Sequence, residues 1–188
     1  MTIYFIAGPP GIGKSTYGRE LIPNHVPIVD HDLAAYQYKK KGFADYSELA
    51  SFRANQFVQE CLSSQADFAI ELNLGYPSHY EYVKSLLSSG KGIKIHLLLF
   101  FTDNVELCIL RAKVRHQNGG HLVEPLVIKE MYNNTITLFK QHSGLFSSVS
   151  FIKVMDTEVE EVTMDNLPGW ITDNNLGGYV SSGKWDVG

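Results

Sequence analysis

The residues with the clearest chemistry lie between Gly8 and Ser15. Their sequence, GPPGIGKS, fits the spacing G-x-x-x-x-G-K-[ST], in which glycines permit a loop whose backbone N–H groups surround a phosphate. Lys14 would reach the β- and γ-phosphates, and the Ser15 hydroxyl would take one coordination position of Mg²⁺. The pattern predicts a site for a nucleoside triphosphate with Mg²⁺.

An apolar run precedes this loop and a potential helix, residues 13–21, follows it, so strand, loop and helix stand in the order that such a site needs. The alternative is a glycine-rich turn that happens to contain a lysine, and the local context favours the nucleotide site. We expect nucleotide contacts from Gly8, Gly11, Ile12, Gly13, Lys14, Ser15 and Thr16.

Two carboxylates follow a second short apolar run, residues 26–29. Alternate side chains of a strand share a face, so Asp30 and Asp32 are expected to point into one cleft. We predict that Asp32 is the general base of a phosphoryl transfer and that Asp30 supports Mg²⁺, through water or directly. The alternative for either residue is the N-cap of a following helix, where aspartate is favoured.

A third apolar run, residues 67–72, contains Glu71 close to its end, with Asn73 just beyond it. An apolar strand interior favours a cleft position for this carboxylate. We predict that Glu71 and Asn73 bind substrate, and Glu71 could also help to hold the metal. The alternative is a strand-end carboxylate that accepts a hydrogen bond from a neighbouring turn.

Arg111 and Arg115 lie one turn apart on a predicted helix, residues 104–116, that Asp103 is expected to cap. The glycine-containing loop that follows is a candidate lid. We predict that Arg115 stabilises the charge on the transferred phosphoryl group and that His121 contacts substrate. For Arg111 the sequence favours a solvated or salt-bridged helix face.

Helical segments alternate with the apolar runs, which also include residues 93–101 and 150–155. This order predicts an α/β domain with a central parallel sheet of about five strands. Ligands bind beyond the carboxyl ends of such strands, where the predicted site residues stand. We divide the chain into a domain of residues 1–156 and a C-terminal extension of residues 157–188, whose Trp170 and Trp185 argue against a wholly solvated tail.

Composition narrows the function classes. The net charge of −4 gives no general reason to expect a nucleic-acid surface. Cys61 and Cys108 are expected to be reduced core thiols, because no metal-binding spacing and no secretory leader accompany them. The longest apolar run is too short to cross a bilayer as a helix. A cytoplasmic protein without a membrane span is expected.

These motifs together resemble the zeta-toxin family of P-loop kinases over residues 3–155. The resemblance is carried by the phosphate loop, then Ile28-Val29-Asp30-His31-Asp32, Ala69-Ile70-Glu71, Arg115 with Gly119-Gly120-His121-Leu122-Val123, and Tyr132. It implies a three-layer P-loop kinase fold with a helical lid, and an ATP- and Mg²⁺-dependent kinase that acts on a UDP-activated amino sugar such as UDP-N-acetylglucosamine. It also implies roles for Lys14 and Ser15 at phosphate and metal, Asp32 as base, Glu71 at substrate and Arg115 at the phosphates. Members of the family often pair with an antitoxin that obstructs the nucleotide site.

The chain departs from the family at two places. Leu33-Ala34-Ala35 follows Asp32 where the family commonly has an arginine or lysine, and Met131 stands where many members carry an arginine. Lys129 is near but is expected to project from a different part of its helix. One phosphate-binding cation is therefore missing or replaced.

Three other functions stay open beside the leading one. A shikimate- or gluconate-like metabolite kinase would also place Asp-x-Asp after its second strand, and a polynucleotide 5′-kinase could use the same core, although the acidic balance disfavours it. An ATP-binding switch or interaction module with weak ATPase activity is the alternative of another class. The chain lacks an obvious apolar run ending in Asp-Glu, which disfavours a dedicated ATPase.

Overall fold

A computed structural model describes residues 1–180 and contains one mixed sheet of six strands. The strands are β1 (Thr2–Ala7), β2 (Ile28–Val29), β3 (Phe68–Leu72), β4 (Lys94–Phe101), β5 (Ser148–Val154) and β6 (Val159–Glu161), in the spatial order β2-β3-β1-β4-β5-β6. The first five are parallel, which confirms the predicted α/β fold. The sixth pairs antiparallel to β5 and was not predicted, because its three residues form too short and polar a run to indicate a strand.

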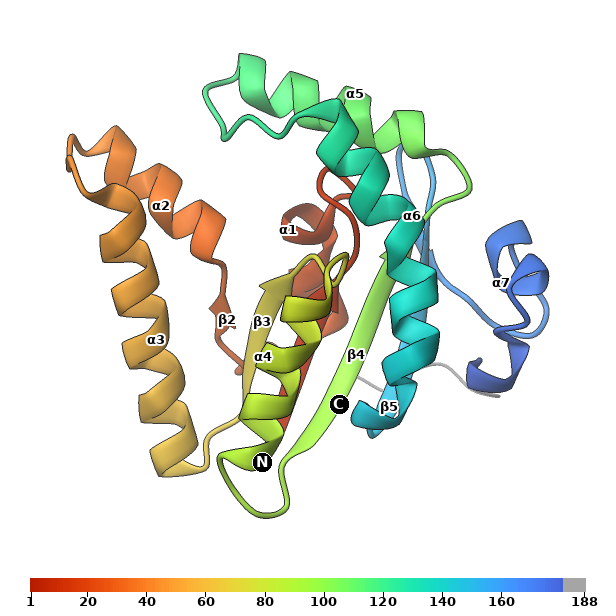
Figure 1. Ribbon diagram of the computed structural model, residues 1–188, viewed down its shortest axis with the longest axis horizontal. Helices are drawn as coiled ribbons and strands as arrows, with labels where there is room; N and C mark the ends of the chain where they lie inside the picture. The colour runs from red at the N-terminus through yellow and green to blue at the C-terminus, as the bar shows by residue number, and fades with distance from the viewer. Residues whose placement is uncertain (181–188) are drawn as a thin grey trace.

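Helices connect the strands and cover the sheet (Figure 1). They are α1 (Lys14–Tyr17), continued by the 3₁₀ turn η1 (Gly18–Leu21), α2 (His31–Lys40), α3 (Tyr46–Ser64), α4 (Pro77–Ser88), α5 (Val105–Gln117), α6 (Pro125–His142), η2 (Ser143–Leu145), α7 (Gly169–Asp173) and η3 (Gly177–Tyr179). None of the helices within residues 1–180 is long and apolar enough to span a membrane.

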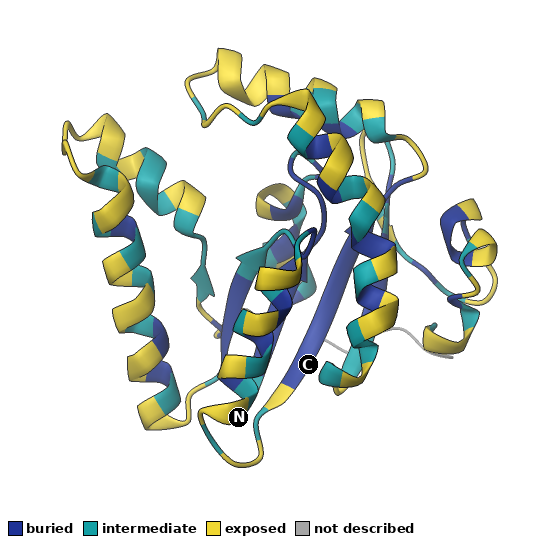
Figure 2. Ribbon diagram, in the orientation of Figure 1, coloured by how far each residue is buried: buried dark blue, intermediate teal, exposed yellow. Residues whose placement is uncertain are grey.

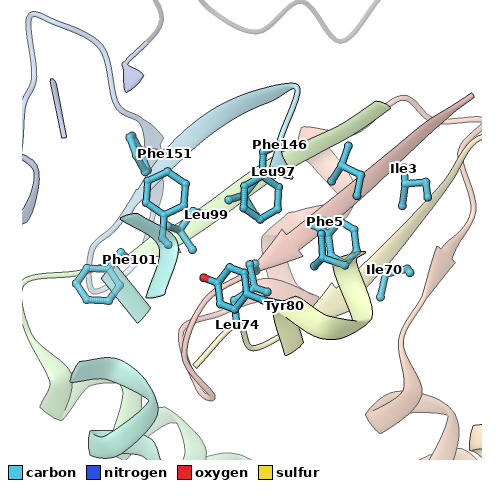
Figure 3. Packing of buried hydrophobic residues seen from close by; sticks show 14 of the residues in the cluster. Ile3, Phe5, Ile70, Leu74, Tyr80, Leu97, Leu99, Phe101, Phe146 and Phe151 are labelled. Atoms are coloured by element: carbon cyan, nitrogen blue, oxygen red, sulfur yellow. The ribbon is translucent and has the colours of Figure 1, made fainter. Parts of the chain in front are cut away.

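Two apolar clusters lie on opposite faces of the sheet, because side chains of a strand alternate between faces. Ile3 and Phe5 of β1 belong to the larger cluster with residues of α3, α4, α6 and α7, part of which Figure 3 shows. Tyr4 and Ile6 belong to the second, with residues of the phosphate loop and α5. β1, β3, β4 and β5 are therefore largely buried in the middle of three layers (Figure 2), whereas the edge strands β2 and β6 are more exposed.

The segment after β5 completes the larger cluster. Trp170 of α7 is 4% exposed, and its ring contacts Phe101 and Phe151 edge-on at centroid distances of 5.2 and 5.4 Å. Trp185 lies outside the described residues. The division of the chain at residue 156 stays a prediction.

One predicted helix cap is wrong. The Oδ1 atom of Asn104 accepts a hydrogen bond from the backbone N–H of Glu106 at 3.0 Å, so Asn104 caps α5. The Asp103 carboxylate instead accepts the backbone N–H of Trp170 at 2.9 Å. Asp103 and Asn104 both have side chains that can cap a helix. The contact between Asp103 and Trp170, 67 residues away, engages Asp103 and leaves the capping position to Asn104.

Candidate active site

The loop between β1 and α1 has a shape that requires glycine. Gly8, Gly11 and Gly13 have φ values of 145°, 79° and 107°. A Cβ on Gly8 would lie 2.4 Å from the carbonyl oxygen of Phe100, and one on Gly11 would lie 2.2 Å from that of Cys108. The loop therefore rests directly on the end of β4 and on α5, in the conformation and close contact that the phosphate-binding motif predicts.

Lys14 lies beneath this loop and is only 6% exposed. Its Nζ atom donates to the carbonyl oxygens of Gly8 at 2.8 Å and Pro9 at 3.1 Å, and to Oδ1 of Asn73 at 2.9 Å. Burial lowers the pKa of Lys14, and the nearby carboxylates of Glu71 and Asp32 oppose that shift. The end of β3 thus helps to hold the ammonium group at the loop.

Glu71, in β3, contacts the other functional residue of the motif. The Ser15 hydroxyl donates to Oε1 of Glu71 at 2.9 Å. Burial raises the pKa of Glu71, while the charge of Lys14 opposes the increase. The carboxylate therefore reaches the phosphate loop, not a turn beside its own strand, and it forms one polar group with Lys14 and Ser15.

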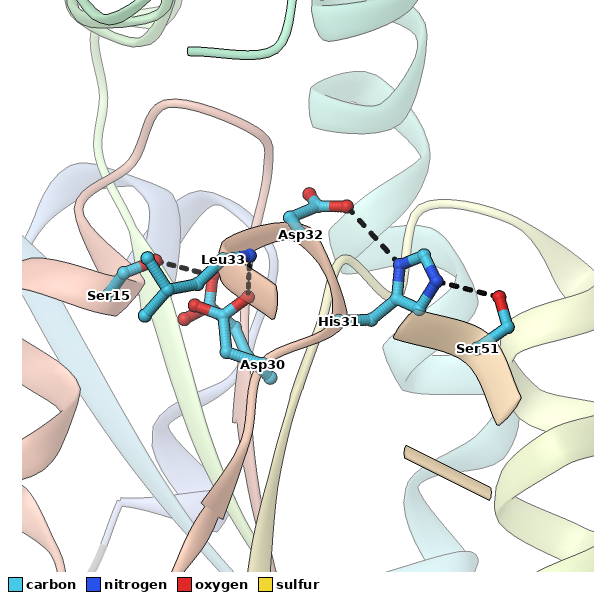
Figure 4. Close-up of polar contacts among 7 residues, drawn as sticks. Ser15, Asp30, His31, Asp32, Leu33 and Ser51 are labelled. Carbon is cyan, nitrogen blue, oxygen red and sulfur yellow. Dashed lines mark hydrogen bonds and ion pairs between the residues drawn. The ribbon is translucent and has the colours of Figure 1, made fainter. Parts of the chain in front are cut away.

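Asp30 and Asp32 are positioned by a helix, contrary to the strand-based prediction. β2 ends at Val29, and Asp30 is the N-cap of α2, with Oδ1 accepting the backbone N–H of Leu33 at 2.9 Å (Figure 4). Asp32 follows in the first turn of α2 and lines the same cleft as Lys14. The capping alternative therefore applies to Asp30. Strand alternation cannot relate the two side chains, because neither lies in a strand.

The predicted lid residues lie in the last turn of α5 and in the loop that follows it. Arg115 lines the cleft, and its Nη2 atom lies 3.5 Å from the carbonyl oxygen of His121. A Cβ on Gly120 would lie 2.7 Å from Cγ of Arg115, so the loop passes close to that side chain. His121 lines two adjoining hollows and not the central cleft. The closing motion of this segment stays a prediction.

Arg111 differs from the helix-face interpretation. Its guanidinium donates to the carbonyl oxygen of Ile12 at 2.9 Å, and to those of Met155 and Asp156 at 2.8 and 2.9 Å. It also lines the cleft. The sequence signal that could have indicated a role at the site was its position one turn before Arg115. Its hydrogen-bond partners could not be predicted, because they are 99, 44 and 45 residues away in the sequence. Arg111 fastens the phosphate loop to the turn after β5.

These contacts surround a cleft of about 430 Å³. It is lined by Pro10, Gly11, Gly13, Lys14, Ser15, Thr16, Tyr17, Asp32, Glu71, Asn73, Arg111, Arg115, Val123 and Asp156. Among the predicted nucleotide contacts, Gly8 and Ile12 do not line it. The Ile12 side chain is fully buried in the second apolar cluster, so only its backbone is available to a ligand.

A second cavity of about 340 Å³ adjoins the cleft, because Ser15, Asp32 and Arg115 line both. Its other lining residues are Asp30, Leu33, Tyr36, Asn118, Gly120 and His121. The predicted base therefore stands between a space beside the phosphate loop and a space beside the predicted lid. An acceptor molecule bound in the second cavity would lie beside Asp32, which lines that cavity.

The oxygen donors at the loop suit Mg²⁺. This ion binds few protein ligands and keeps waters and phosphate oxygens in its remaining positions. Ser15 and Glu71 offer a hydroxyl and a carboxylate in direct contact. Within residues 1–180 no group of three or more His, Cys, Asp or Glu side chains forms a protein-only metal site. The metal role predicted for Asp30 stays a prediction, and its carboxylate already caps α2.

Met131 does not face the cleft in the way a phosphate-binding arginine would. It is 9% exposed, and a Cβ on Gly75 would lie 2.6 Å from its own Cβ. Lys129 forms an ion pair with Glu106 at 2.9 Å. Of the described residues that line the cleft, the cationic ones are Lys14, Arg111 and Arg115.

Comparisons with known proteins support the fold. No family model and no curated protein matches the sequence. A chain of the PezAT chromosomal toxin–antitoxin system of the human pathogen Streptococcus pneumoniae matches with a TM-score of 0.56 and 18% identity, over 99% of this chain and 80% of that chain. A chain of the AvrRxo1-ORF1:-ORF2 structure with ATP matches with a TM-score of 0.63 and 15% identity, over 86% of this chain but only 57% of that one. The α/β fold matches that of P-loop kinase structures.

Proposed function

We propose that this protein is an ATP- and Mg²⁺-dependent kinase that transfers the γ-phosphoryl group to a hydroxyl of a nucleotide sugar such as UDP-N-acetylglucosamine. The observation that carries the proposal is the shared cleft of the phosphate loop, Lys14, Asp32, Glu71 and Arg115. Phosphoryl transfer requires positioning, charge compensation and a group that orients or deprotonates the acceptor, and these residue types supply each of them.

In the proposed reaction the acceptor oxygen forms a bond to the γ-phosphorus while the bond to the bridging oxygen of ADP breaks. Asp32 takes the hydroxyl proton, and Lys14 and Arg115 stabilise the charge on the phosphoryl oxygens. Glu71 and Asn73 orient the acceptor, with His121 beside the second cavity.

Mg²⁺, when bound, would neutralise charge on the phosphate oxygens. Ser15 is the proposed protein ligand, with Asp30 or Glu71 acting through water or directly. The cation that the family resemblance predicts near Met131 would be replaced by Arg111, which lines the cleft from α5 beside Arg115.

The nucleotide-sugar acceptor follows from the family resemblance, and the cavity beside Asp32 gives it room. A protein that obstructs the nucleotide cleft, as an antitoxin would, belongs to the same proposal. The PezAT structure comes from a toxin–antitoxin system, which supports looking for such a partner. We place the reaction in the cytoplasm, where ATP is available.

The test is a mass-spectrometric search for a new phosphate. The protein, ATP and Mg²⁺ are incubated with UDP-N-acetylglucosamine, other nucleotide sugars and a metabolite extract. Asp32→Asn is expected to lower the rate by about 10²–10⁴-fold while nucleotide binding is retained, because it removes a general base. Asp45→Asn, an exposed aspartate at the start of α3, is the matched control and should leave the rate unchanged.

The outcomes separate the alternatives. A product formed only in the extract would keep the kinase and replace the acceptor, as expected for a metabolite kinase. Phosphorylated oligonucleotide, with retention on single-stranded DNA at moderate salt, would indicate the polynucleotide kinase. Nucleotide binding without any product would favour the switch module and overturn the proposed function.

A further inference from the structure

The turn between β5 and β6 forms one edge of the cleft and is held there by side chains from two other elements. The hydroxyl of Tyr17 donates to the carbonyl oxygen of Thr157 at 3.0 Å. Arg111 donates to the carbonyl oxygens of Met155 and Asp156 at 2.8 and 2.9 Å. Three successive carbonyl groups of this turn therefore already accept hydrogen bonds from the protein.

This edge is separate from the edge at which the acceptor residues stand. Asn73 and Glu71 contact Lys14 and Ser15 at the end of β3, whereas the turn contacts α5 and the end of α1. A donor whose phosphates lie on the loop, with its γ-phosphate beside the acceptor residues, would place its base on the side of the turn. This placement rests on the proposed function, since it takes the loop as the site of the donor phosphates.

Asp156 is the acidic residue of the turn that lines the cleft. It is exposed and lines the cleft, while its own carbonyl group is fixed by Arg111. Within residues 1–180 its carboxylate has no hydrogen bond or ion pair. An ionised carboxylate offers only acceptor positions, so a ligand group that binds to it would bring N–H or O–H donors.

Guanine and adenine differ in what they offer to such a group. Guanine carries the N1–H and N2–H donors side by side, which a carboxylate accepts with its two oxygens in a charge-assisted pair. Adenine carries one amino donor beside the N1 lone pair, which faces a carboxylate unfavourably. The carbonyl groups of the turn are engaged by Tyr17 and Arg111, which leaves the turn fewer free acceptors for an adenine amino group.

We propose that the donor site recognises guanine through Asp156, so that the protein binds and uses GTP at least as well as ATP. Asp156 is then a specificity-determining residue for the donor nucleotide. Its neighbours Tyr17 and Arg111 hold the turn and leave the choice of base to its side chain.

The test compares the affinities of GTP and ATP, each with Mg²⁺, for the full chain by isothermal titration calorimetry. The wild-type protein is expected to bind GTP at least as tightly as ATP. Asp156→Asn replaces one acceptor with an amide donor, which suits the N1 and amino edge of adenine. We expect it to shift the ratio of GTP to ATP affinity towards ATP by about tenfold or more.

Glu158→Gln is the matched control, because it removes the same charge from an exposed residue of the same turn that does not line the cleft. It should leave the ratio unchanged. Tighter binding of ATP than of GTP by the wild type, or an unchanged ratio in Asp156→Asn, would overturn the inference. Binding and product formation are measured separately. A GTP preference without phosphorylated product would overturn the proposed kinase activity and keep the assignment of guanine to Asp156. A product formed with strict ATP preference would keep the kinase activity and overturn that assignment. Binding of neither nucleotide would overturn both.

Discussion

The polar side chains of the candidate active site are positioned by one another. An ammonium group has three N–H donors, and Lys14 has three acceptors within 3.1 Å, one of them on Asn73. Burial of this charge is tolerated because it is paired. Asn73, predicted as a substrate contact, therefore also orients the lysine, and its role towards substrate stays a prediction.

A buried histidine in β4 gives the protein a predictable pH dependence. His96 is 2% exposed and lies beside the hydroxyl of Ser148 on β5. Burial lowers the pKa of His96 to about 4 from its ordinary value of 6.5. The folded protein thus keeps the ring neutral, whereas the unfolded chain takes up a proton near pH 6.5. The associated stability is present above pH 6.5 and is lost as the pH falls towards 4, in total about 3 kcal/mol.

The measurement is urea unfolding of the wild type and His96→Gln at pH 7 and pH 4.5. The wild type should lose about 2–3 kcal/mol more unfolding free energy than the variant over this interval, because the variant has no ring to protonate. Equal losses in the two proteins would show that His96 does not contribute to the pH dependence.

At the scale of elements, α5 is the support of the phosphate loop. The carbonyl group of Cys108 lies so close to Gly11 that no side chain fits at position 11. From the same helix, the Arg111 guanidinium donates a hydrogen bond to the carbonyl oxygen of Ile12. Arg115 continues along this helix to the cleft. Successive turns of this one helix thus contact the phosphate loop through Cys108, bind its backbone through Arg111, and bring the cationic side chain of Arg115 to the cleft.

We expect Arg111→Met to raise the KM for the donor nucleotide by about tenfold or more. Hydrogen bonds from a charged group contribute roughly 1.5–3 kcal/mol each, and three of them hold the loop and the turn together. The KM for the acceptor should change little, because its proposed cavity is not lined by Arg111. Steady-state kinetics with each substrate varied in turn measures both values.

Lys113→Met removes a charge from an exposed residue of the same helix and serves as the control. It should leave both KM values unchanged. An equal rise of donor and acceptor KM in Arg111→Met, with a matching loss of thermal stability, would mean that the residue acts only on folding.

At the scale of the whole molecule, the residues after β5 belong to the folded core. β6 extends the sheet, and α7 brings Trp170 against Phe101 and Phe151. Asp103 links this segment to the end of β4 through the backbone N–H of Trp170. The described part of the predicted extension is therefore packed against the central sheet.

Trp170→Ala is expected to reduce the free energy of unfolding by about 3–5 kcal/mol, because it removes a buried ring and leaves a cavity. Trp170→Phe, which keeps an aromatic ring, should cost less. Chemical denaturation followed by circular dichroism measures both. A loss below about 1 kcal/mol for Trp170→Ala would show that the segment contributes little to the stability of the core.

The sequence by itself predicted the first five strands in their order along the chain, and the phosphate loop. Apolar runs and glycine spacing are local properties, so the run at residues 2–7 and the glycines that follow it indicate their structure without any partner. The same local signals predicted that Lys14, Asp32, Glu71 and Arg115 would stand beyond strand ends or beside a loop, and the structure brings these four residues to one cleft.

The tertiary structure decided which of several similar polar residues caps a helix and which one binds a distant loop. Asp30 caps α2 although Asp32 was an equally suitable capping residue, Asn104 caps α5 because Asp103 contacts Trp170, and Arg111 fastens a loop 99 residues away. Such choices depend on contacts between distant segments, and no local pattern records them. The physical reason is that a polar side chain takes whichever partner the packed chain brings within hydrogen-bond distance.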